Sequence, residues 1–194
     1  MKALKVLIII LASFCGIAFL LPRDFTVTRT IEINASISDV FEQANTLSNW
    51  VNWSAWHKMD PNANYSYSTP DKGKGATYSF DGDPELIGAG SLTILESIEN
   101  KSIRTEIIFL KEGEENGRGN GEWAFTEKNG LTLVSWSFLG DMGNNPVARW
   151  IGLLMDSMLG PQLKKGLNNM KEYLESSNLE ETVEELPTDS YIVE

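Results

Sequence analysis

Apolar and polar positions alternate along most of the middle of this chain. Residues 25–34, FTVTRTIEIN, predict a strand with one buried face. Its inward residues are Phe25, Val27, Ile31 and Ile33, and a change of register is expected near Arg29. Similar strand-like runs follow at residues 65–68, 76–80, 90–97, 102–110, 121–126 and 131–139. Turn-rich pieces separate these runs, so we predict one antiparallel sheet of about seven strands.

One face of this predicted sheet collects the large apolar side chains. Successive side chains of a strand point to opposite faces, and Arg104, Glu106 and Glu122 fall on the polar face. The inward face comprises Tyr78, Phe80, Leu92, Ile94, Ile103, Thr105, Ile107, Phe109, Trp123, Phe125, Val134, Trp136 and Phe138. A curved sheet with an apolar, aromatic-rich concave face is the simplest consequence.

A short amphipathic helix leads into three regularly spaced tryptophans. In the sequence ISDVFEQANTL, the apolar positions follow a helical stripe, and Ser36 or Ser38 can serve as the N-cap. Trp50, Trp53 and Trp56 come directly afterwards, three residues apart. Core packing is the favoured interpretation of the three tryptophans, because each ring buries a large apolar area. Lining of a ligand cavity is the alternative.

A long helical pattern follows Pro146. Its sequence, VARWIGLLMDSMLGPQLKKGLNNMKEYLE, is interrupted at Gly160 and Pro161. Because proline removes a backbone donor and clashes with the preceding turn, we expect two segments or one bent helix. The buried stripe of the second part consists of Leu163, Leu167, Met170 and Leu174. This helix can cover the apolar face of the sheet.

Residues 1–22 have the composition of a membrane segment. Lys2 and Lys5 precede an apolar run that continues to Leu21. The run comes close to the hydrocarbon thickness of about 30 Å, so we predict an N-terminal membrane anchor, with a cleaved signal segment as the alternative. Because positive residues favour the cytoplasm, we expect a single-pass membrane protein with its domain extracytoplasmic, in the periplasm of a Gram-negative cell. Cleavage would give a secreted protein.

Charge and cysteine content narrow the classes of function. The formal net charge of −11 argues against a nucleic-acid partner, since such binding depends on Lys and Arg contacts to phosphate. Residues 177–194 are acidic and contain no basic residue, which predicts a solvated, disordered tail. A docking segment for a protein partner is the alternative for this tail. Cys15 is the only cysteine, so an intrachain disulfide cannot form.

Few residues carry recognisable chemistry. His57 is the only histidine, which excludes a multi-histidine metal site, and we expect it on a surface loop rather than at a cavity mouth. The glycines of residues 113–121, GEENGRGNG, predict a hairpin loop. The sequence contains no common hydrolase, metalloprotease or nucleotide-binding motif. We therefore expect no metal and no cofactor, and catalytic residues remain unknown at this point.

The order of these elements resembles the helix-grip fold of the START-like SRPBCC superfamily. Within that superfamily, the chain is most similar to the polyketide cyclase/dehydrase and lipid-transport type of family. The resemblance covers about residues 25–175 and is strongest in TRTIEINASISDVFEQANTLSNWVNWSAWHKMDP, LTLVSWSFLG and MDSMLGPQLKKGLNNMKEYLE. It implies an α+β domain over residues 23–176, with two short helices and a long C-terminal helix over a hydrophobic cavity.

The resemblance also implies candidate ligand-binding residues. Members of the superfamily hold lipids, sterols or polyketides in this cavity, and a minority catalyse reactions on them. The cavity candidates are Trp53, Trp56, Tyr78, Phe80, Ile94, Ile107, Phe109, Trp123, Phe125, Val134, Trp136, Leu167 and Met170. We expect a membrane-anchored domain that binds a hydrophobic small molecule or lipid without a need for catalysis. The alternatives are an enzyme of cyclase or dehydratase type and a protein-interaction module.

Overall fold

The strands form one curved antiparallel sheet in the order β1-β7-β6-β5-β4-β3-β2. The computed structural model describes residues 2–184, with side chains described as far as residue 176. The strands are β1 (Asp24–Ile33), β2 (Asn64–Tyr67), β3 (Thr77–Asp81), β4 (Ala89–Ile98), β5 (Ser102–Lys111), β6 (Glu114–Lys128) and β7 (Leu131–Asp141). The helices are α1 (Lys2–Ala18), α2 (Ile37–Asn45), the 3-10 helix η1 (Leu47–Asn49), α3 (Trp50–Trp53), α4 (Ala55–Met59), α5 (Pro146–Gly152) and α6 (Met155–Glu184). The antiparallel sheet predicted from the sequence is confirmed.

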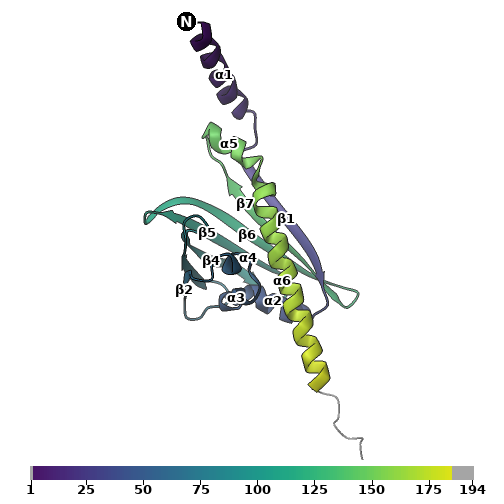
Figure 1. Ribbon diagram of the computed structural model, residues 1–194. Helices are drawn as coiled ribbons and strands as arrows, with labels where there is room; N and C mark the ends of the chain where they lie inside the picture. Colours follow the sequence, from purple (N-terminus) through teal and green to yellow (C-terminus); the bar gives the residue numbers. More distant parts are fainter. Residues whose placement is uncertain (1, 185–194) are drawn as a thin grey trace, which may run out of the picture.

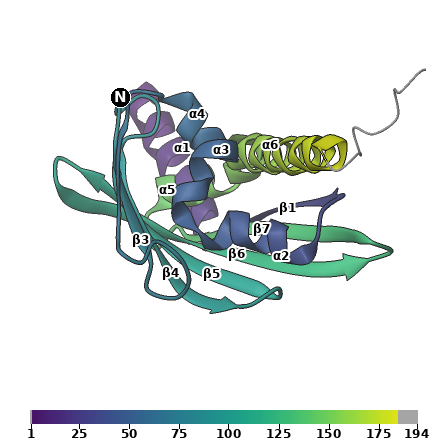
Figure 2. The ribbon, with the colours of Figure 1, turned by 90° about the horizontal axis from the view of Figure 1, so that it is seen from below.

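Helices cover the concave face of this sheet (Figure 1). In Figure 2, α2, α3, α4 and α6 all lie on the same side of the strands. α6 packs along β1 and also contacts α3 and α4. Its apolar stripe, Leu163, Leu167, Met170 and Leu174, is buried as the sequence predicts. This is the α+β helix-grip arrangement, with the C-terminal helix packed on the sheet.

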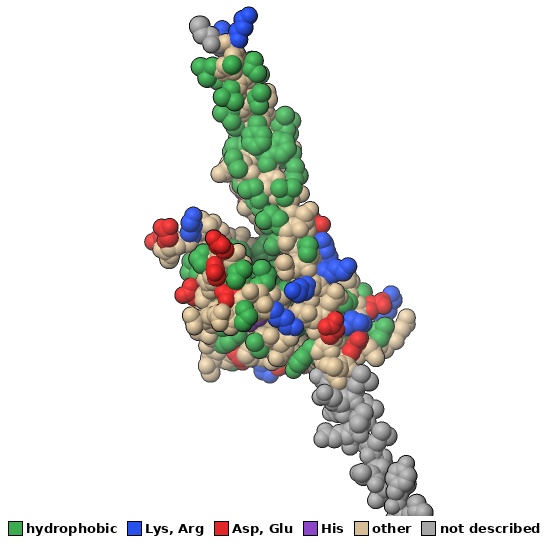
Figure 3. Space-filling model, viewed as in Figure 1, with side chains coloured by type: hydrophobic (Ala, Val, Ile, Leu, Met, Phe, Trp, Pro, Cys, Tyr) green, Lys and Arg blue, Asp and Glu red, His purple; other side chains and the backbone are tan. Residues whose placement is uncertain are grey.

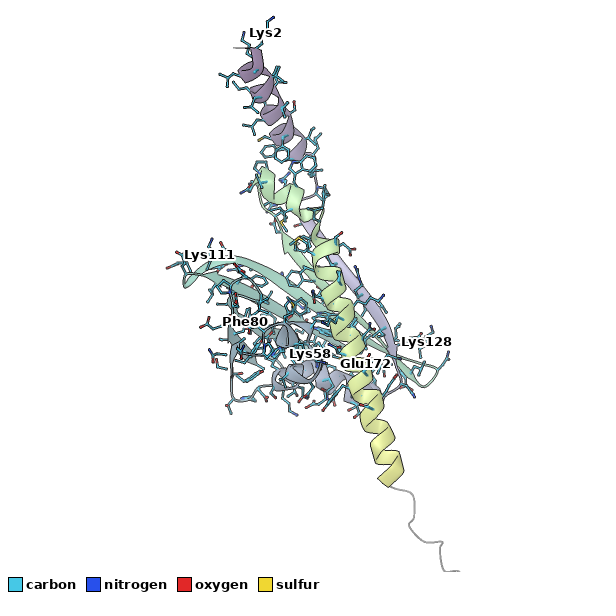
Figure 4. All side chains as sticks on the ribbon, in the orientation of Figure 1. Lys2, Lys58, Phe80, Lys111, Lys128 and Glu172 are labelled. Atoms are coloured by element: carbon cyan, nitrogen blue, oxygen red, sulfur yellow. The ribbon has the colours of Figure 1, made fainter. Side chains whose placement is uncertain are left out.

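One end of the sheet gathers several chain connections. The register pairs Asp24 with Asp141 and Ala89 with Leu110. The start of β1 and the end of β7 therefore lie at the same end of the sheet as the β3–β4 loop and the β5–β6 turn. We call this end the α1 end, because α1 leads into β1 there. The β6–β7 turn, beside Lys128, lies at the opposite end (Figure 4).

β6 is longer than the sequence predicts. A two-residue turn at 112–113, in which both residues have positive φ, joins β5 to β6. The predicted hairpin loop over residues 113–121 is therefore wrong, and Gly117, Gly119 and Gly121 lie inside a strand. Glycine is uncommon in strand interiors, which is why composition alone favoured a loop. The alternation places all three glycines on the inward face.

β1 pairs with β7 without any shift from Asp24 to Ile33. The predicted change of register near Arg29 is therefore wrong, and Arg29 belongs to the inward face. Its guanidinium lies against Gly160 of α6 and pairs with Asp156 at 2.8 Å. A Cβ on Gly160 would overlap the guanidinium, so this glycine allows α6 to pass close over the arginine. The charge of Arg29 is tolerated on the inward face because its partner, Asp156, is solvent-exposed.

α6 is a single helix with Pro161 inside it. The predicted interruption at Gly160-Pro161 does not divide it, and the helix break falls earlier, between α5 and α6. α6 also continues through residues 177–184, which the sequence had assigned to a disordered tail. Glu and Leu in this segment favour a helix, which accounts for the extension. The rest of the predicted tail, residues 185–194, lies outside the described residues.

α1 is apolar on all sides. Its side chains from Val6 to Leu11 are each 56–64% exposed. Near its end, Phe14 stacks on Trp150 of α5 with ring centroids 5.1 Å apart. α1 contains 17 residues. Within residues 2–184, no helix combines the length and the apolar character needed to cross a membrane.

Candidate functional site

A cavity of about 250 Å³ lies between the concave face of the sheet and the covering helices. All of the side chains in its wall are uncharged, and most are aromatic or branched aliphatic. The wall consists of Trp50, Trp56, Tyr65, Tyr78, Phe80, Leu86, Ile87, Leu92, Thr105, Ile107, Phe109, Gly121, Trp136, Phe138 and Leu159. Such a wall suits a ligand that is largely apolar and carries no net charge.

Glycine on β6 makes room for this cavity. Gly121 lies opposite Thr105 on β5 and Phe138 on β7. A Cβ at Gly121 would collide with the hydroxyl of Thr105, so no larger residue fits there without a shift. Two residues further along β6, Trp123 lies opposite Trp136 and fills the space under the helices. The change from glycine to tryptophan along one strand therefore divides the cavity from the packed core.

A cluster of tryptophans lies beneath the cavity, and Trp50 and Trp136 of this cluster reach its wall. Trp123 and Trp136 stack with ring centroids 4.2 Å apart and planes at 16°. Trp53 meets both rings edge-on at 5.7 Å. Trp50 donates its indole N–H to the carbonyl oxygen of Ala44 at 3.0 Å, so this buried polar atom is satisfied. Interlocked rings of this kind give the cavity a rigid base.

The cavity opens at the α1 end of the sheet. Among its wall residues, Leu86 and Phe109 are 47% and 36% exposed and mark the mouth. Leu86 belongs to the β3–β4 loop, residues 82–88. The buried carboxylate of Asp60 holds this loop by accepting a hydrogen bond from the backbone N–H of Asp83 at 2.7 Å. The mouth is therefore bounded by an anchored loop and by the end of β5.

Besides the indole N–H groups of the tryptophans, the polar side-chain groups of the wall are hydroxyls. They belong to Tyr65, Tyr78 and Thr105. Burial raises the pKa of Tyr65 to about 12 and also raises the pKa of Tyr78. Both phenols therefore remain protonated at neutral pH and can donate a hydrogen bond to a ligand oxygen.

His57 lies directly behind these tyrosines. It is 7% exposed on α4, so the prediction of a surface-loop position is wrong. Its ring stacks on Tyr65 with centroids 4.0 Å apart, and its Nε2 is 3.5 Å from the hydroxyl of Tyr67. Burial lowers the pKa of His57 to about 4, which leaves the imidazole neutral at pH 7. The sequence did not reveal this because β2, which covers the ring, is brought there only by folding.

The structure divides the predicted cavity residues into two groups. The cavity wall contains Trp56, Tyr78, Phe80, Ile107, Phe109 and Trp136. The packed core, away from the wall, contains Trp53, Ile94, Trp123, Phe125, Val134, Leu167 and Met170. Alternation identified the inward face correctly. However, α2, α3 and α6 pack against the half of this face that is remote from the α1 end, so no cavity remains there. The ligand-binding role of the six wall residues remains a prediction.

Several wall residues were absent from the predicted set. Leu92, Thr105 and Phe138 lay on the predicted inward face and could have been included by position. Other wall residues come from outside the sheet: Trp50, Leu86, Ile87 and Leu159. Exposed apolar residues in a loop, such as Leu86, are a weak signal of a cavity rim. Gly121 could have been found from the row of glycines that shares the face of Trp123.

Solved structures with the same fold include proteins from natural-product biosynthesis. The di-domain ARO/CYC StfQ from the steffimycin biosynthetic pathway matches with a TM-score of 0.57 at 10% identity, over 80% of this chain and 52% of that one. DynU16, from the dynemicin biosynthetic locus, matches with a TM-score of 0.53 at 13% identity over 78% of this chain. This chain spans 48% of DynU16, and at such identities the likeness shows the fold alone.

A smaller structural neighbour matches over almost its full length. It is a protein from Staphylococcus epidermidis, with a TM-score of 0.55 at 18% identity over 80% of this chain and 91% of that one. A search of curated proteins gave no match. The family model for polyketide cyclase / dehydrase and lipid transport matches residues 24–175, from the start of β1 to the buried part of α6. The chain therefore belongs to the polyketide cyclase/dehydrase and lipid-transport family, with the SRPBCC type of fold.

Proposed function

We propose that this protein binds a small, neutral, hydrophobic molecule in its cavity and is held at a membrane by α1. The observation that carries the proposal is the cavity itself, about 250 Å³ in volume, with an uncharged wall and an open mouth. Ligand sites of this kind are mostly apolar with a few polar groups that set orientation. Here the hydroxyls of Tyr65, Tyr78 and Thr105 take that role.

The volume limits the size of the ligand. Sites for drug-sized molecules usually measure about 300–1,000 Å³, so this cavity lies just below that range. A short acyl chain or a molecule of one or two rings fits such a space, whereas a whole phospholipid does not. Burial of about 200 Å² of apolar ligand surface would contribute about 5 kcal/mol before ordering costs are subtracted.

Membrane attachment by α1 would place the cavity beside a store of apolar molecules. The exposed apolar side chains of α1 and the two lysines at its start support an anchor in a bilayer. Because α1 is too short to cross a bilayer by itself, this attachment also needs the exposed apolar residues Phe19 and Leu20 that follow it. With Lys2 and Lys5 on the cytoplasmic side, the domain would then lie outside the cytoplasm. A protease added to intact host cells should then digest the domain, and complete protection until lysis would contradict this orientation.

A paired substitution on β5 tests ligand binding. Ile107 lies in the cavity wall, and Ile108 points to the opposite face of the same strand. The probe is N-phenyl-1-naphthylamine, whose fluorescence rises in apolar sites, added to the full chain in phosphatidylcholine nanodiscs with empty nanodiscs as background. Ile107→Trp should fill the cavity and remove the protein-dependent signal, while Ile108→Trp should keep it. Equal signals from both variants would count against binding in this cavity.

Cyclase or dehydratase chemistry on the bound molecule is a second candidate. One observation favours it, namely the phenol of Tyr78 in the wall with the ring of His57 5.8 Å away. A protonated phenol could polarise a ligand carbonyl, although a neutral histidine behind it does not reach the cavity wall. Mass spectrometry of the extracted ligand before and after incubation would detect chemical conversion. If Tyr78→Phe abolishes this conversion but still binds the ligand, the protein is an enzyme.

A further inference from the structure

α5 and the beginning of α6 carry an exposed apolar surface that nothing else in the described chain covers. Its residues are Val147, Ile151, Leu153, Leu154 and Met158, each between 43% and 57% exposed. We call this surface the α5 collar. From residue 146 to residue 155 the only charged side chain is Arg149, and it is 8% exposed because it points into the protein.

The α5 collar is continuous with the apolar surface of α1. Phe14 of α1 stacks on Trp150 of α5, and the indole N–H of Trp150 donates to the carbonyl oxygen of Phe14 at 3.3 Å. Arg149 donates to the carbonyl oxygens of Phe19 and Leu21, at 3.1 Å and 3.4 Å, and so fastens the segment that follows α1. Figure 3 shows the result as one unbroken apolar column over α1 and α5.

A lipid bilayer is the occupant that fits this column. Successive residues of a helix point about 100° apart, so the exposed run from Val6 to Leu11 presents apolar side chains in every direction. A protein partner, including a second copy of this chain, would cover one side of such a helix and leave the other in water. Lipid surrounds a helix completely.

α1 by itself is too short for the bilayer, which is a reason for the α5 collar to lie in the membrane as well. With 17 residues at about 1.5 Å each, α1 measures about 25 Å, less than the hydrocarbon thickness of about 30 Å. Apolar helices that lie in a membrane interface insert by about 5–10 Å. α1 together with the collar therefore matches the apolar depth better than α1 alone.

Charged residues mark the boundary of the apolar column. Arg23 and Asp141 form an ion pair just after the segment that follows α1. The exposed Asp156, which lies between Leu154 and Met158 of the collar, pairs with Arg29, so the collar meets the boundary in the first turn of α6. The cavity mouth, at Leu86 and Phe109, lies at the same end of the sheet as α1. A bilayer that reaches this boundary would face the mouth.

We propose that the α5 collar is a second membrane contact, which inserts into the interfacial layer of the bilayer that holds α1 and turns the cavity mouth toward lipid. The proposal rests on the membrane attachment put forward above. It assigns a specific task to α5, which is to set the angle of the domain so that an apolar ligand can pass between bilayer and cavity without crossing water.

Site-specific quenching tests this contact in the full chain. Cys15→Ser removes the natural thiol, and single cysteines are then placed by Ile9→Cys in α1, Ile151→Cys in the collar and Lys128→Cys at the opposite end. Each is labelled with the fluorophore NBD and reconstituted in phosphatidylcholine nanodiscs that contain doxyl-labelled acyl chains. We expect strong quenching and a blue-shifted emission at positions 9 and 151, and neither at position 128. Leu154→Cys repeats the collar measurement at an independent site.

The possible outcomes separate the anchor from the collar. If position 9 is quenched while positions 151 and 154 behave like position 128, α1 is an anchor but the collar lies in water, which overturns this proposal alone. If position 9 is also unquenched, the membrane attachment itself fails. If position 151 is shielded from aqueous iodide and also unquenched by the lipid, a protein covers the collar, which again overturns the proposal.

Discussion

The tryptophans of this chain show how one residue type takes different tasks according to its position. Trp53 is 0% exposed in the packed core, and the carbonyl oxygen of Trp53 accepts a hydrogen bond from Asn169 of α6 at 2.9 Å. Trp56, three residues later, is half-buried in the cavity wall against Trp136, with ring centroids 5.7 Å apart. Core packing is therefore confirmed for Trp53. Trp50 is buried and Trp56 is half-buried, and both border the cavity, while ligand binding by them stays a prediction.

The two tryptophans should separate stability from binding. Trp53→Ala should lower the free energy of unfolding by about 3–5 kcal/mol, because it opens a hole in a close-packed cluster. Trp56 borders space that is already empty. Trp56→Ala should therefore lower the free energy of unfolding by less than half as much as Trp53→Ala, and it should instead weaken probe binding. Chemical denaturation and probe titration of both variants provide the comparison. A greater loss of stability for Trp56→Ala would contradict this division.

His57 offers a direct measurement of burial. Its folded pKa of about 4 lies below the unfolded value of about 6.5, so protonation favours the unfolded chain. Its contribution to stability is therefore complete above pH 6.5 and is lost as the pH falls toward 4. Because it is the only histidine, its ring signals in an NMR titration can be assigned without mutagenesis. We expect no protonation between pH 7 and pH 5.5, whereas a midpoint near 6.5 would mean an exposed ring.

At the scale of elements, Arg149 connects parts of the chain that are remote in sequence. Besides the carbonyl oxygens of Phe19 and Leu21, it donates to the carbonyl oxygen of Gly143 at 3.0 Å, and its guanidinium lies 5.4 Å from the centre of the Phe19 ring. One side chain thus holds α5, the end of β7 and the segment after α1 together. The angle between α1 and the sheet depends on this contact.

Arg149→Lys should loosen the segment after α1 while the fold is retained. Lysine keeps the charge but cannot reach several carbonyl oxygens at once. The loss of about 1.5 kcal/mol of hydrogen bonding corresponds to roughly tenfold faster local opening. Limited chymotrypsin digestion after Phe19 should accelerate by that factor. Arg104→Lys, at an exposed arginine that pairs with Glu96, serves as the matched control and should leave the rate unchanged.

At the scale of the whole molecule, ligand binding and stability are coupled. A ligand that fills the cavity binds only the folded state, so it raises the free energy of unfolding. At roughly 100 times the Kd, the gain is about 2.7 kcal/mol, which for a domain of this size corresponds to about 5–10 °C in Tm. N-phenyl-1-naphthylamine should produce this shift in the wild-type chain. Ile107→Trp should show no shift, and an equal shift in that variant would place the probe elsewhere.

The sequence predicted much of the architecture, because periodicity and caps are local properties. The inward positions of β3 to β7 followed from alternation, and Ser36 accepts a hydrogen bond from the backbone N–H of Asp39 as an N-cap should. The errors came where composition and context disagree. Gly117 to Gly121 have the composition of a loop yet form a strand, because pairing with β5 and β7 supplies the hydrogen bonds that hold it.

By itself, the sequence determined the inward face of the sheet, the apolar stripe of α6, the apolar character of α1 and the family. These depend on the spacing of side chains along the chain. Only the tertiary structure decided where the inward face is packed and where it is hollow, because this depends on which part of the sheet the helices approach. The burial of His57 under β2 and the contact between the apolar surfaces of α1 and α5 also arise only in the tertiary structure. Distances between residues far apart in the chain are set by packing, and no local pattern encodes them.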